Sequence, residues 1–313
     1  MMKWSISAHN MFHRCQRQYL FNNIMASETS NEVLRREAHI LKQLQGLSAW
    51  QGSLVHEGIR LFLVPRLKGN AKIPMEEVIA PITALARQQF TFSQGKGYRN
   101  AYMTREIAGT RYAALYEHEF NHEINESHLQ QVLENVRTSF VNLFEQEQLL
   151  EEIRNHRGLQ CESFLRFYVK DITIWSKLDL VFYRTDGHLV IIDWKIGDDV
   201  ASDYSHQIMV YALAAKHRWP RTPVENFEIK EVNLLKNTIT VYPLTTEKLL
   251  ETEDFIYRSS TDIRDLTGDQ SWDAQCLEDF EPARSGRTCQ YCKFRKLCQE
   301  VYVDLPSAES IQN

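Results

Sequence analysis

No apolar run in the sequence approaches the roughly 20 residues that a membrane-spanning helix needs, and the first ten residues lack the apolar stretch of a secretory signal. We therefore expect a globular, cytoplasmic protein without a membrane partner. Basic residues are not in excess either, because the formal net charge is -5. Binding to a polyanion would consequently depend on local basic patches. Internal repeats, low-complexity tracts and a clear interdomain linker are also missing.

The chain does have the length and apolar content for a sizeable core. Its 313 residues are 43% hydrophobic, which allows one large or two small domains. Apolar residues recur at helical spacing as far as about residue 156, and the period changes toward that of strands at Gln160. We therefore predict an α/β fold. The expected parts are a core in residues 31–64 and 157–265, a helical insertion in residues 65–156, and a subdomain built from residues 1–30 and 266–313.

Residues 177–195, KLDLVFYRTDGHLVIIDWK, form the most informative stretch. Two apolar runs flank an Asp-Gly turn dipeptide, which predicts two strands joined as a hairpin. Asp179 lies in the first strand. In the second, Asp193 and Lys195 are two residues apart, so their side chains share one face. Mg²⁺ and Mn²⁺ prefer carboxylate oxygens, and a lysine beside them can hold an anionic oxygen. The pattern is typical of a hard-metal site, although solvated acids on a plain hairpin would give the same letters.

Three consecutive strands are expected around this hairpin, and their short connections predict an antiparallel meander. Glu162, in the first of them, is a candidate to point toward the same site. The expected strands are residues 161–169, 171–183, 188–194, 226–235 and 238–244, and the helices that accompany them are residues 203–219 and 245–264. The predicted core order is therefore helix, three strands, helix, strand.

Two groups of side chains have roles that the local sequence leaves open. His56 lies beside the apolar face of a predicted helix, where a histidine is either a hydrogen-bonded core residue or a ligand. The segment FSQGKGYRNAYM, residues 92–103, alternates basic and aromatic residues. Its candidates for holding a nucleic-acid strand by charge and stacking are Lys96, Tyr98, Arg99 and Tyr102. The same composition is typical of a solvated loop, which we favour.

Three cysteines near the C-terminal end form the most specific pattern in the chain. Cys289, Cys292 and Cys298 have C-x2-C-x5-C spacing and are interleaved with basic residues. Thiols this close in a reducing compartment indicate a metal rather than disulfides. Zinc and iron-sulfur clusters both bind thiolates and usually take four protein ligands. The candidates for the fourth ligand are Cys15, Cys161 and Cys276.

Together these residues resemble the PD-(D/E)XK nucleases of the RecB type, which have a restriction-endonuclease-like core. The positions that carry the resemblance are His56, Asp179, Asp193-Trp194-Lys195, Gln207 and Tyr211. The resemblance implies that a catalytic Mg²⁺ or Mn²⁺ is bound by His56, Asp179, Asp193 and the Trp194 carbonyl. It further implies that Lys195 orients the water and stabilises charge, while Gln207 and Tyr211 position Lys195 or the DNA backbone. Lys177 departs from the pattern, because the family often has glycine there.

The split cysteines are more particularly similar to those of the iron-sulfur nucleases of the AddB-like and CRISPR-adaptation branches. In these branches a cysteine within a Cys-(Pro)-basic-x-aromatic stretch near the N-terminus joins three C-terminal cysteines to bind a 4Fe-4S cluster. Residues 15–19, CQRQY, match that stretch apart from the proline. The resemblance therefore selects Cys15 as the partner of Cys289, Cys292 and Cys298. We expect the cluster to be a structural staple that closes the chain into a ring, with a redox role as the alternative.

The resemblance implies metal-dependent hydrolysis of DNA phosphodiesters, on single strands or at duplex ends, in repair, CRISPR adaptation or antiphage defence. The sequence has no P-loop motif, so unwinding would come from a separate helicase, ATPase or other subunit. One alternative is a lapsed nuclease that serves as a nucleic-acid-binding or assembly subunit. Intact Asp179, Asp193 and Lys195 favour the enzyme. A zinc-ribbon binder is the other alternative, and it would be colourless.

Overall fold

The computed structural model describes residues 2–67, 73–197, 204–268 and 270–302. The chain forms two compact units. Unit 1 comprises Met1–Leu44, Tyr168–Ile174 and Phe255–Asn313, and unit 2 comprises Gln45–Phe167 and Trp175–Asp254. Unit 2 therefore contains the expected helical insertion together with the central strands. Residues 68–72 of an expected loop, Asp203 at the start of an expected helix and residues 303–313 of the expected C-terminal subdomain lie outside the described residues.

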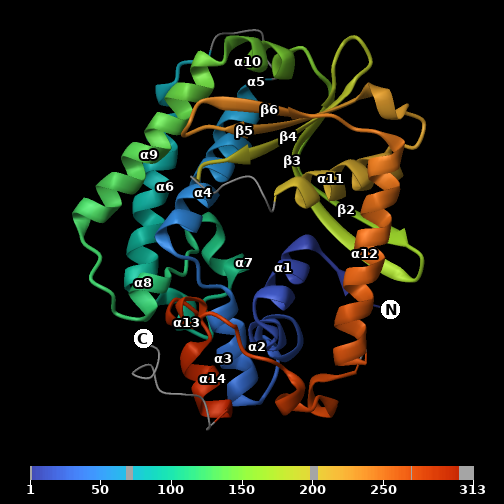
Figure 1. Ribbon diagram of the computed structural model, residues 1–313. Helices are drawn as coiled ribbons and strands as arrows, with labels where there is room; N and C mark the ends of the chain where they lie inside the picture. Colours follow the sequence, from blue (N-terminus) through green and yellow to red (C-terminus); the bar gives the residue numbers. More distant parts are fainter. Residues whose placement is uncertain (1, 68–72, 198–203, 269, 303–313) are drawn as a thin grey trace. The chain divides into compact units, whose positions relative to one another are not determined.

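Unit 2 combines a helical layer with most of the sheet (Figure 1). Its helices are α4 (Leu47–Gly58), α5 (Val64–Leu67), α6 (Glu76–Gln94), α7 (Arg105–Ala108), α8 (Tyr116–Glu119), α9 (Glu126–Glu145), α10 (Glu147–Arg154) and α11 (Tyr204–Arg218). A π-helical segment, Ile59–Leu63, joins α4 to α5. The long helix α9 begins at a capping box, because Asn125 and His128 bond to each other's backbone N–H. Helix α4 packs against both α6 and α9.

The strands are β2 (Arg157–Val169), β3 (Ile172–Tyr183), β4 (Leu189–Lys195), β5 (Phe227–Asn233) and β6 (Thr238–Tyr242). Strand β2 pairs with β3, β4 lies between β3 and β5, and β6 is the edge. The β3–β4 and β5–β6 pairs are antiparallel, whereas β4 and β5 are parallel and are connected through α11. The predicted order of helix, three strands, helix and strand is therefore confirmed, and the α/β class with it.

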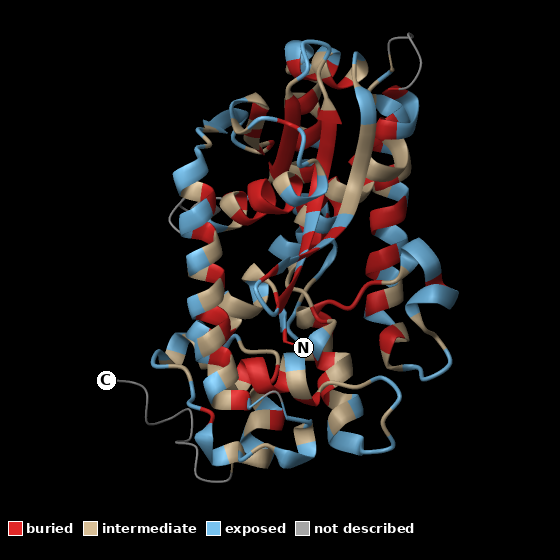
Figure 2. Ribbon diagram, turned by 90° about the vertical axis from the view of Figure 1, so that its right-hand side faces the viewer, coloured by how far each residue is buried: buried red, intermediate tan, exposed pale blue. Residues whose placement is uncertain are grey.

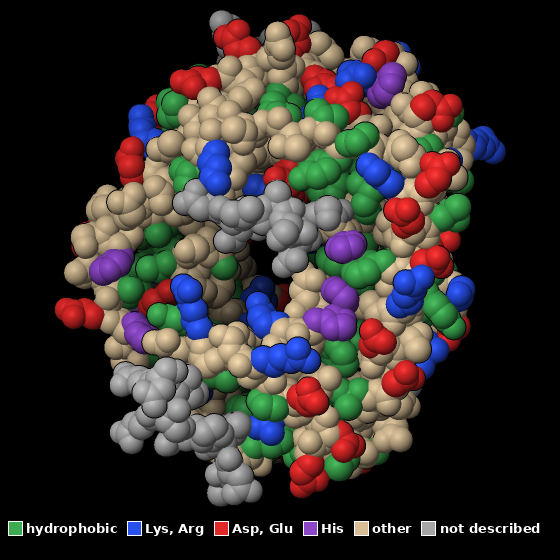
Figure 3. All heavy atoms as spheres, viewed as in Figure 1, with side chains coloured by type: hydrophobic (Ala, Val, Ile, Leu, Met, Phe, Trp, Pro, Cys, Tyr) green, Lys and Arg blue, Asp and Glu red, His purple; other side chains and the backbone are tan. Residues whose placement is uncertain are grey.

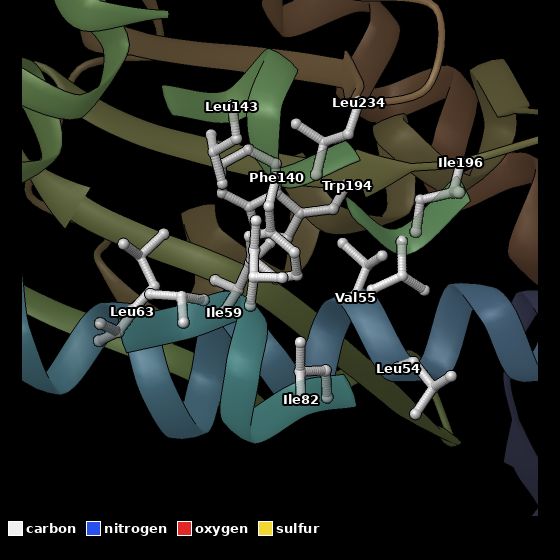
Figure 4. Packing of buried hydrophobic residues seen from close by; sticks show 14 of the residues in the cluster. Leu54, Val55, Ile59, Leu63, Ile82, Phe140, Leu143, Trp194, Ile196 and Leu234 are labelled. Atoms are coloured by element: carbon white, nitrogen blue, oxygen red, sulfur yellow. The ribbon is translucent and has the colours of Figure 1, made fainter. Parts of the chain in front are cut away.

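The pairing register of β3 with β4 decides which side chains enter the core. Leu180 lies opposite Ile192, and both belong to the hydrophobic core of unit 2. Because side chains alternate along a strand, Trp194 follows Ile192 into that core, where Figure 4 shows it among residues from the surrounding helices. Strand β4 is buried along almost its whole length (Figure 2). Asp193 and Lys195 consequently project from the opposite face of the sheet.

Unit 1 brings together segments from both ends of the sequence. Its elements are β1 (Lys3–Trp4), α1 (Ile6–Arg14), α2 (Gln16–Tyr19), a π-helical segment (Leu20–Met25), α3 (Val33–Lys42), the second half of α12 (Thr246–Thr267), α13 (Gly286–Gln290) and α14 (Arg295–Val301). Ser5 caps α1, since its side chain accepts from the backbone N–H of Ala8. Phe21 stacks on Phe294 with ring centroids 5.7 Å apart. Lys293 Nζ donates to the carbonyl of Lys42 at 2.6 Å, which ties the C-terminal segment to the end of α3.

The basic and aromatic segment at residues 92–103 is neither a free nucleic-acid clamp nor a wholly solvated loop. Tyr98 is buried and donates its hydroxyl hydrogen to Glu119 at 2.9 Å, and Arg99 Nε donates to the same carboxylate at 2.7 Å. Glu119 thus binds Tyr98 and Arg99, which precede it by 21 and 20 residues. Local sequence does not encode such a contact. Of the four candidates, Tyr102 is the one that is 86% exposed.

The surface has no uniformly basic face in the view of Figure 3, where acidic and basic side chains are mixed. This agrees with the formal net charge of -5. In the described part of the chain, no helix is both long enough and apolar enough to cross a membrane.

Two glycines of α4 provide a matched test of the helical packing. A Cβ added at Gly58 would lie 2.5 Å from Phe140 Cζ, whereas a Cβ at Gly52 would have no atom within 4 Å. We expect Gly58→Ala to lower the free energy of unfolding by about 1–3 kcal/mol through overpacking. Gly52→Ala should raise it by about 0.5–1 kcal/mol, because alanine favours a helix over glycine. Urea unfolding followed by circular dichroism measures both. An equal gain in the two variants would contradict the packing of α4 on α9.

Candidate functional site

Two aspartates lie next to each other on neighbouring strands of unit 2. The register that pairs Leu180 with Ile192, continued by one residue, places Asp179 of β3 opposite Asp193 of β4. Both side chains are buried, with exposures of 8% and 2%. The backbone N–H of Trp194 donates to Asp179 Oδ2 at 3.0 Å, which fixes that carboxylate against β4. The hairpin thus concentrates two acidic groups where the strand leaves the core.

His56 and Glu162 bring two more ligating groups to Asp179. Nδ1 of His56 lies 3.5 Å from Asp179 Oδ1 and 3.6 Å from Glu162 Oε1, and the ligand atoms of the three residues lie within 4.8 Å of one another. Nε2 of His56 is 3.2 Å from the carbonyl oxygen of Trp194. A proton on Nε2 would donate to that carbonyl and leave Nδ1 available to a cation. One imidazole nitrogen and two carboxylates are a donor set that suits Mn²⁺ or Mg²⁺.

Glu162 reaches this group because β2 is not regular there. Its φ angle is +55°, a left-handed conformation that a glutamate within a strand rarely adopts. Such interruptions re-aim a side chain and recur beside functional sites. The carboxylate also forms an ion pair with Lys177 of β3. The sequence marks Glu162 as a candidate through its place at the start of the meander, but alternation alone does not predict its left-handed backbone.

Lys195 and its neighbours form a second chain of contacts. Nζ of Lys195 lies 2.8 Å from Asp193 Oδ2 and donates to Gln207 Oε1 at 3.2 Å. Gln207 in turn donates to the hydroxyl of the buried Tyr211 at 2.5 Å. Gln207 and Tyr211 stand one turn apart on α11, so this helix holds the ammonium group in place through two side chains. All of these groups belong to unit 2.

The electrostatics of the two aspartates differ. Burial raises the pKa of Asp193 to about 7, with the charge of Asp179 adding to the effect and Lys195 opposing it. Burial also acts to raise the pKa of Asp179, but its hydrogen bond with His56 and the histidine charge outweigh this, and the pKa falls below its usual value. For His56 itself, burial opposes a net rise in pKa that comes from Asp179 and Asp193. Burial, followed by the charges of both aspartates, raises the pKa of Tyr211.

The structure thus gathers the candidate residues of unit 2 into two adjoining groups. His56 and Asp179 lie with Glu162, and the Trp194 carbonyl contacts the same histidine. Asp193 lies with Lys195, and within the described ranges it is not part of the close trio. The resemblance names Asp193 as a ligand, whereas Glu162 is expected from its place in the first strand only to point toward the site. The geometry places Glu162 nearer to the histidine than the sequence pattern indicated.

The four selected cysteines line one cavity of about 310 Å³ within unit 1. Its lining comprises Cys15, Arg17, Gln18, Phe21, Pro282, Ala283, Arg284, Gly286, Cys289, Cys292, Phe294, Arg295, Cys298 and Gln299. Cys161 and Cys276 do not belong to this lining. Cys161 is on β2 in unit 2, and Cys276 is exposed with its Sγ 3.4 Å from Glu278 Oε2.

The walls of this cavity supply a backbone N–H donor and a positively charged side chain. The backbone N–H of Gln18 donates to Cys15 Sγ at 3.4 Å, since Cys15 is the N-cap of α2. Arg17 lies over the ring of Tyr302, and its Nη1 atom is buried without a hydrogen-bond partner among the described residues. Burial raises the pKa of Cys298 to about 11, against the opposing charge of Arg17. The raised pKa means that a buried thiol here stays protonated until a metal binds it, and metal binding would release its proton.

Curated proteins and solved structures give little guidance to the function of this site. A search of curated protein sequences finds no significant match. Among solved structures, the protein SSO0001 is 15% identical with a TM-score of 0.30, and the match covers 82% of this chain and 98% of that chain. A protein from Eubacterium rectale reported as "Putative exonuclease" is 10% identical with a TM-score of 0.36, covering 90% and 100% of the two chains. At such TM-scores neither likeness bears on function.

The family comparison is more decisive, because it spans nearly the whole chain. The model of the PD-(D/E)XK nuclease superfamily matches residues 3–299. That range includes His56, both aspartates, Lys195 and the C-terminal cysteines. The chain belongs to the PD-(D/E)XK nuclease superfamily.

Proposed function

We propose that the protein is a Mg²⁺- or Mn²⁺-dependent deoxyribonuclease that hydrolyses phosphodiester bonds in single strands or at duplex ends. The observation that carries this proposal is the close trio of His56, Glu162 and Asp179, whose ligand atoms lie within 4.8 Å of one another. Lys195 pairs with Asp193, and Asp193 lies opposite Asp179 on the neighbouring strand. A hard cation and an ammonium group side by side suit an anionic reacting centre.

The residues of the site would have two separate roles, metal binding and the orientation of water or phosphate. His56, Glu162 and Asp179 would hold the divalent ion, with the Trp194 carbonyl orienting the imidazole. When bound, such an ion neutralises developing charge and lowers the pKa of water. The Lys195 ammonium would orient the attacking water or hold a phosphate oxygen. Asp193, whose Oδ2 lies 2.8 Å from Lys195 Nζ, would hold that group in place next to Asp179.

Gln207 and Tyr211 act as positioning residues in this proposal. Lys195 donates to Gln207, which donates to Tyr211, so the ammonium is held from α11 as well as from β4. Both helix residues could also contact the DNA backbone, as the resemblance implies. In either role they reduce the freedom of the lysine, and reduced freedom of a reacting group lowers the entropic part of the barrier.

We further propose that the unit 1 cavity holds a 4Fe-4S cluster bound by Cys15, Cys289, Cys292 and Cys298. Two features of the cavity fit such a group. Its volume of about 310 Å³ far exceeds that of a single ion, and the buried Nη1 of Arg17 offers a donor to an anionic cluster. When bound, the cluster would link residue 15 to residues 289–298 and so restrict the unfolded chain.

Zinc fits the same cysteines less well. A tetrahedral site with Zn–S bonds of about 2.3 Å brings its sulfurs to about 3.8 Å from one another. In the described part of the chain, no three cysteine sulfurs lie within 4.8 Å of one another. The cavity of about 310 Å³ that these cysteines line has room for a group larger than a single ion.

The cellular setting belongs to the proposal as well. A reducing cytoplasm would keep all six cysteines free, as they are in the described structure. Internal duplex DNA would need strand separation by a helicase, an ATPase or another subunit before cleavage. Repair, CRISPR adaptation and antiphage defence are settings in which such a partner would be supplied.

The catalytic assignment is tested with labelled DNA and Mn²⁺. We expect Asp193→Asn and Lys195→Ala each to lower the rate of cleavage by about 10²–10³-fold, because each removes charge from the reacting centre. Glu134→Gln changes an exposed acid of α9 and should leave the rate unchanged. Metal-dependent cleavage that survives in both site variants would remove the site, and a wild type that never cleaves would favour the non-catalytic assembly subunit.

The ligand assignment is tested without DNA. Calorimetric titration of Mn²⁺ should show one site in the wild type and an affinity at least about tenfold lower in Asp179→Asn and Glu162→Gln. Glu162→Gln and Glu134→Gln make the same chemical change, so the second serves as the control. Unaltered Mn²⁺ affinity in Glu162→Gln, with a loss in Asp193→Asn, would restore the ligand set implied by the resemblance.

The cluster assignment is tested by colour and metal content. Protein purified without oxygen should be brown, absorb at about 400 nm and contain about four iron atoms per chain. Cys15→Ser should lose most of the iron, whereas Cys161→Ser and Cys276→Ser should retain it because neither residue lines the cavity. A colourless protein with one zinc per chain, or equal iron loss in all three variants, would contradict the assignment.

A further inference from the structure

The outer face of the β2–β3 hairpin carries exposed aromatic residues next to cations. On β2, Phe164 is 71% exposed and Arg166 is exposed two residues later. On β3, Trp175 is 43% exposed and Lys177 is exposed two residues later. Residues two apart share a face of a strand, so these four side chains define one surface, here called the hairpin face. All four belong to unit 2.

The four side chains pair across the strands, an aromatic ring with a cation each time. The Arg166 guanidinium lies 5.9 Å from the Trp175 ring centroid, and Lys177 Nζ lies 5.5 Å from that of Phe164. Each strand also alternates one ring with one cation. The face is therefore a small checkerboard of flat apolar surfaces and positive charges. Lysine is depleted at protein–protein interfaces, so Lys177 in the middle of this face favours a polyanion over a protein partner.

The hairpin face leads into the proposed metal site. Trp175, Lys177 and Asp179 follow one another at steps of two along β3, so they share a face, and Trp175 is about 13 Å from Asp179 along the strand. On β2, Glu162 lies two residues before Phe164, and the left-handed backbone at Glu162 accompanies the placing of its carboxylate beside Asp179. Lys177 joins the two regions, because it forms an ion pair with Glu162 and also contacts the Phe164 ring. A polymer bound along this face would therefore reach the carboxylates of the metal site within about 13 Å.

We propose that the hairpin face binds single-stranded DNA, with bases stacked on Phe164 and Trp175 and phosphates contacting Arg166 and Lys177. Exposed rings interleaved with cations are the composition by which proteins bind single strands without sequence preference. A duplex keeps its bases stacked inside and offers nothing to such rings. The inference rests on the proposed nuclease function and narrows its substrate, from single strands or duplex ends, to a single strand fed along β3 toward Asp179.

The test measures binding apart from cleavage. Fluorescence anisotropy with labelled oligo(dT) of about 16 nucleotides, in the absence of divalent metal, gives the affinity. We expect Phe164→Ala and Trp175→Ala each to weaken binding by about 5- to 150-fold, with Phe164→Trp and Trp175→Phe restoring most of it. Arg166→Gln should reduce the slope of log K against log salt by about 0.7, and Lys177→Gln should reduce it by less, because Lys177 is paired with Glu162 when no metal is bound. Ile107→Ala, which removes an exposed apolar side chain elsewhere in unit 2, should bind as the wild type does.

A duplex of the same length separates the inference from general charge attraction. Its affinity should change little in the two aromatic variants, and an equal loss on duplex and single strand would overturn the inference. So would wild-type binding of oligo(dT) by both alanine variants, and if the wild type cleaves DNA with Mn²⁺ the nuclease function would still stand. Aromatic-dependent binding of oligo(dT) by a protein that cleaves nothing would instead support the hairpin face and overturn the nuclease function.

Discussion

Two carboxylates buried side by side, Asp179 and Asp193, are the constraint on which the site depends. Taking a charge out of water costs several kcal/mol unless it is paired, and two like charges together cost more. The fold offsets this with the Trp194 N–H at one aspartate and Lys195 at the other, while His56 approaches from α4. The compensation is unequal, because burial raises the pKa of Asp193 whereas that of Asp179 is lowered. Such unequal environments for paired acids are typical of functional sites.

Side-chain alternation along β4 places Asp193 beside Asp179, and it also places Trp194 in the core, where it anchors the strand. Trp194 fills the core between the helices and β4, which prevents β4 from slipping by one residue and turning Asp193 and Lys195 inward. Helix α4 contributes to both sides of this arrangement, since its apolar residues pack on α6 and α9 while His56 reaches the Trp194 carbonyl. Packing and chemistry therefore share one element. A change that loosens α4 would be expected to disturb the imidazole as well as the core.

Much of this could be predicted from sequence, because it depends on short-range rules. The Asp-Gly turn fixed the hairpin, the step of two placed Asp193 and Lys195 on one face, and helical spacing placed His56 and the pair on α11. What local rules could not predict depends on long-range contacts or on unusual backbone. Glu162 reaches the site through a φ of +55°, and Tyr98 is buried by an acid 21 residues away. The two-residue strand β1 is too short to show a period, and its pairing with β3 joins segments about 170 residues apart.

Lys177 shows how one departure from a family pattern can acquire a role. The family often has glycine at this position, which lets another backbone come close. Here the side chain is half-exposed, and burial of the remainder lowers its pKa. Its ammonium lies between the Glu162 carboxylate and the Phe164 ring, so it cannot move toward a phosphate without releasing one of the two. A cation at Glu162 would compete with Lys177 for the same carboxylate, and the displaced lysine would be free to meet an incoming phosphate. Metal binding and strand binding would then favour each other through this single side chain.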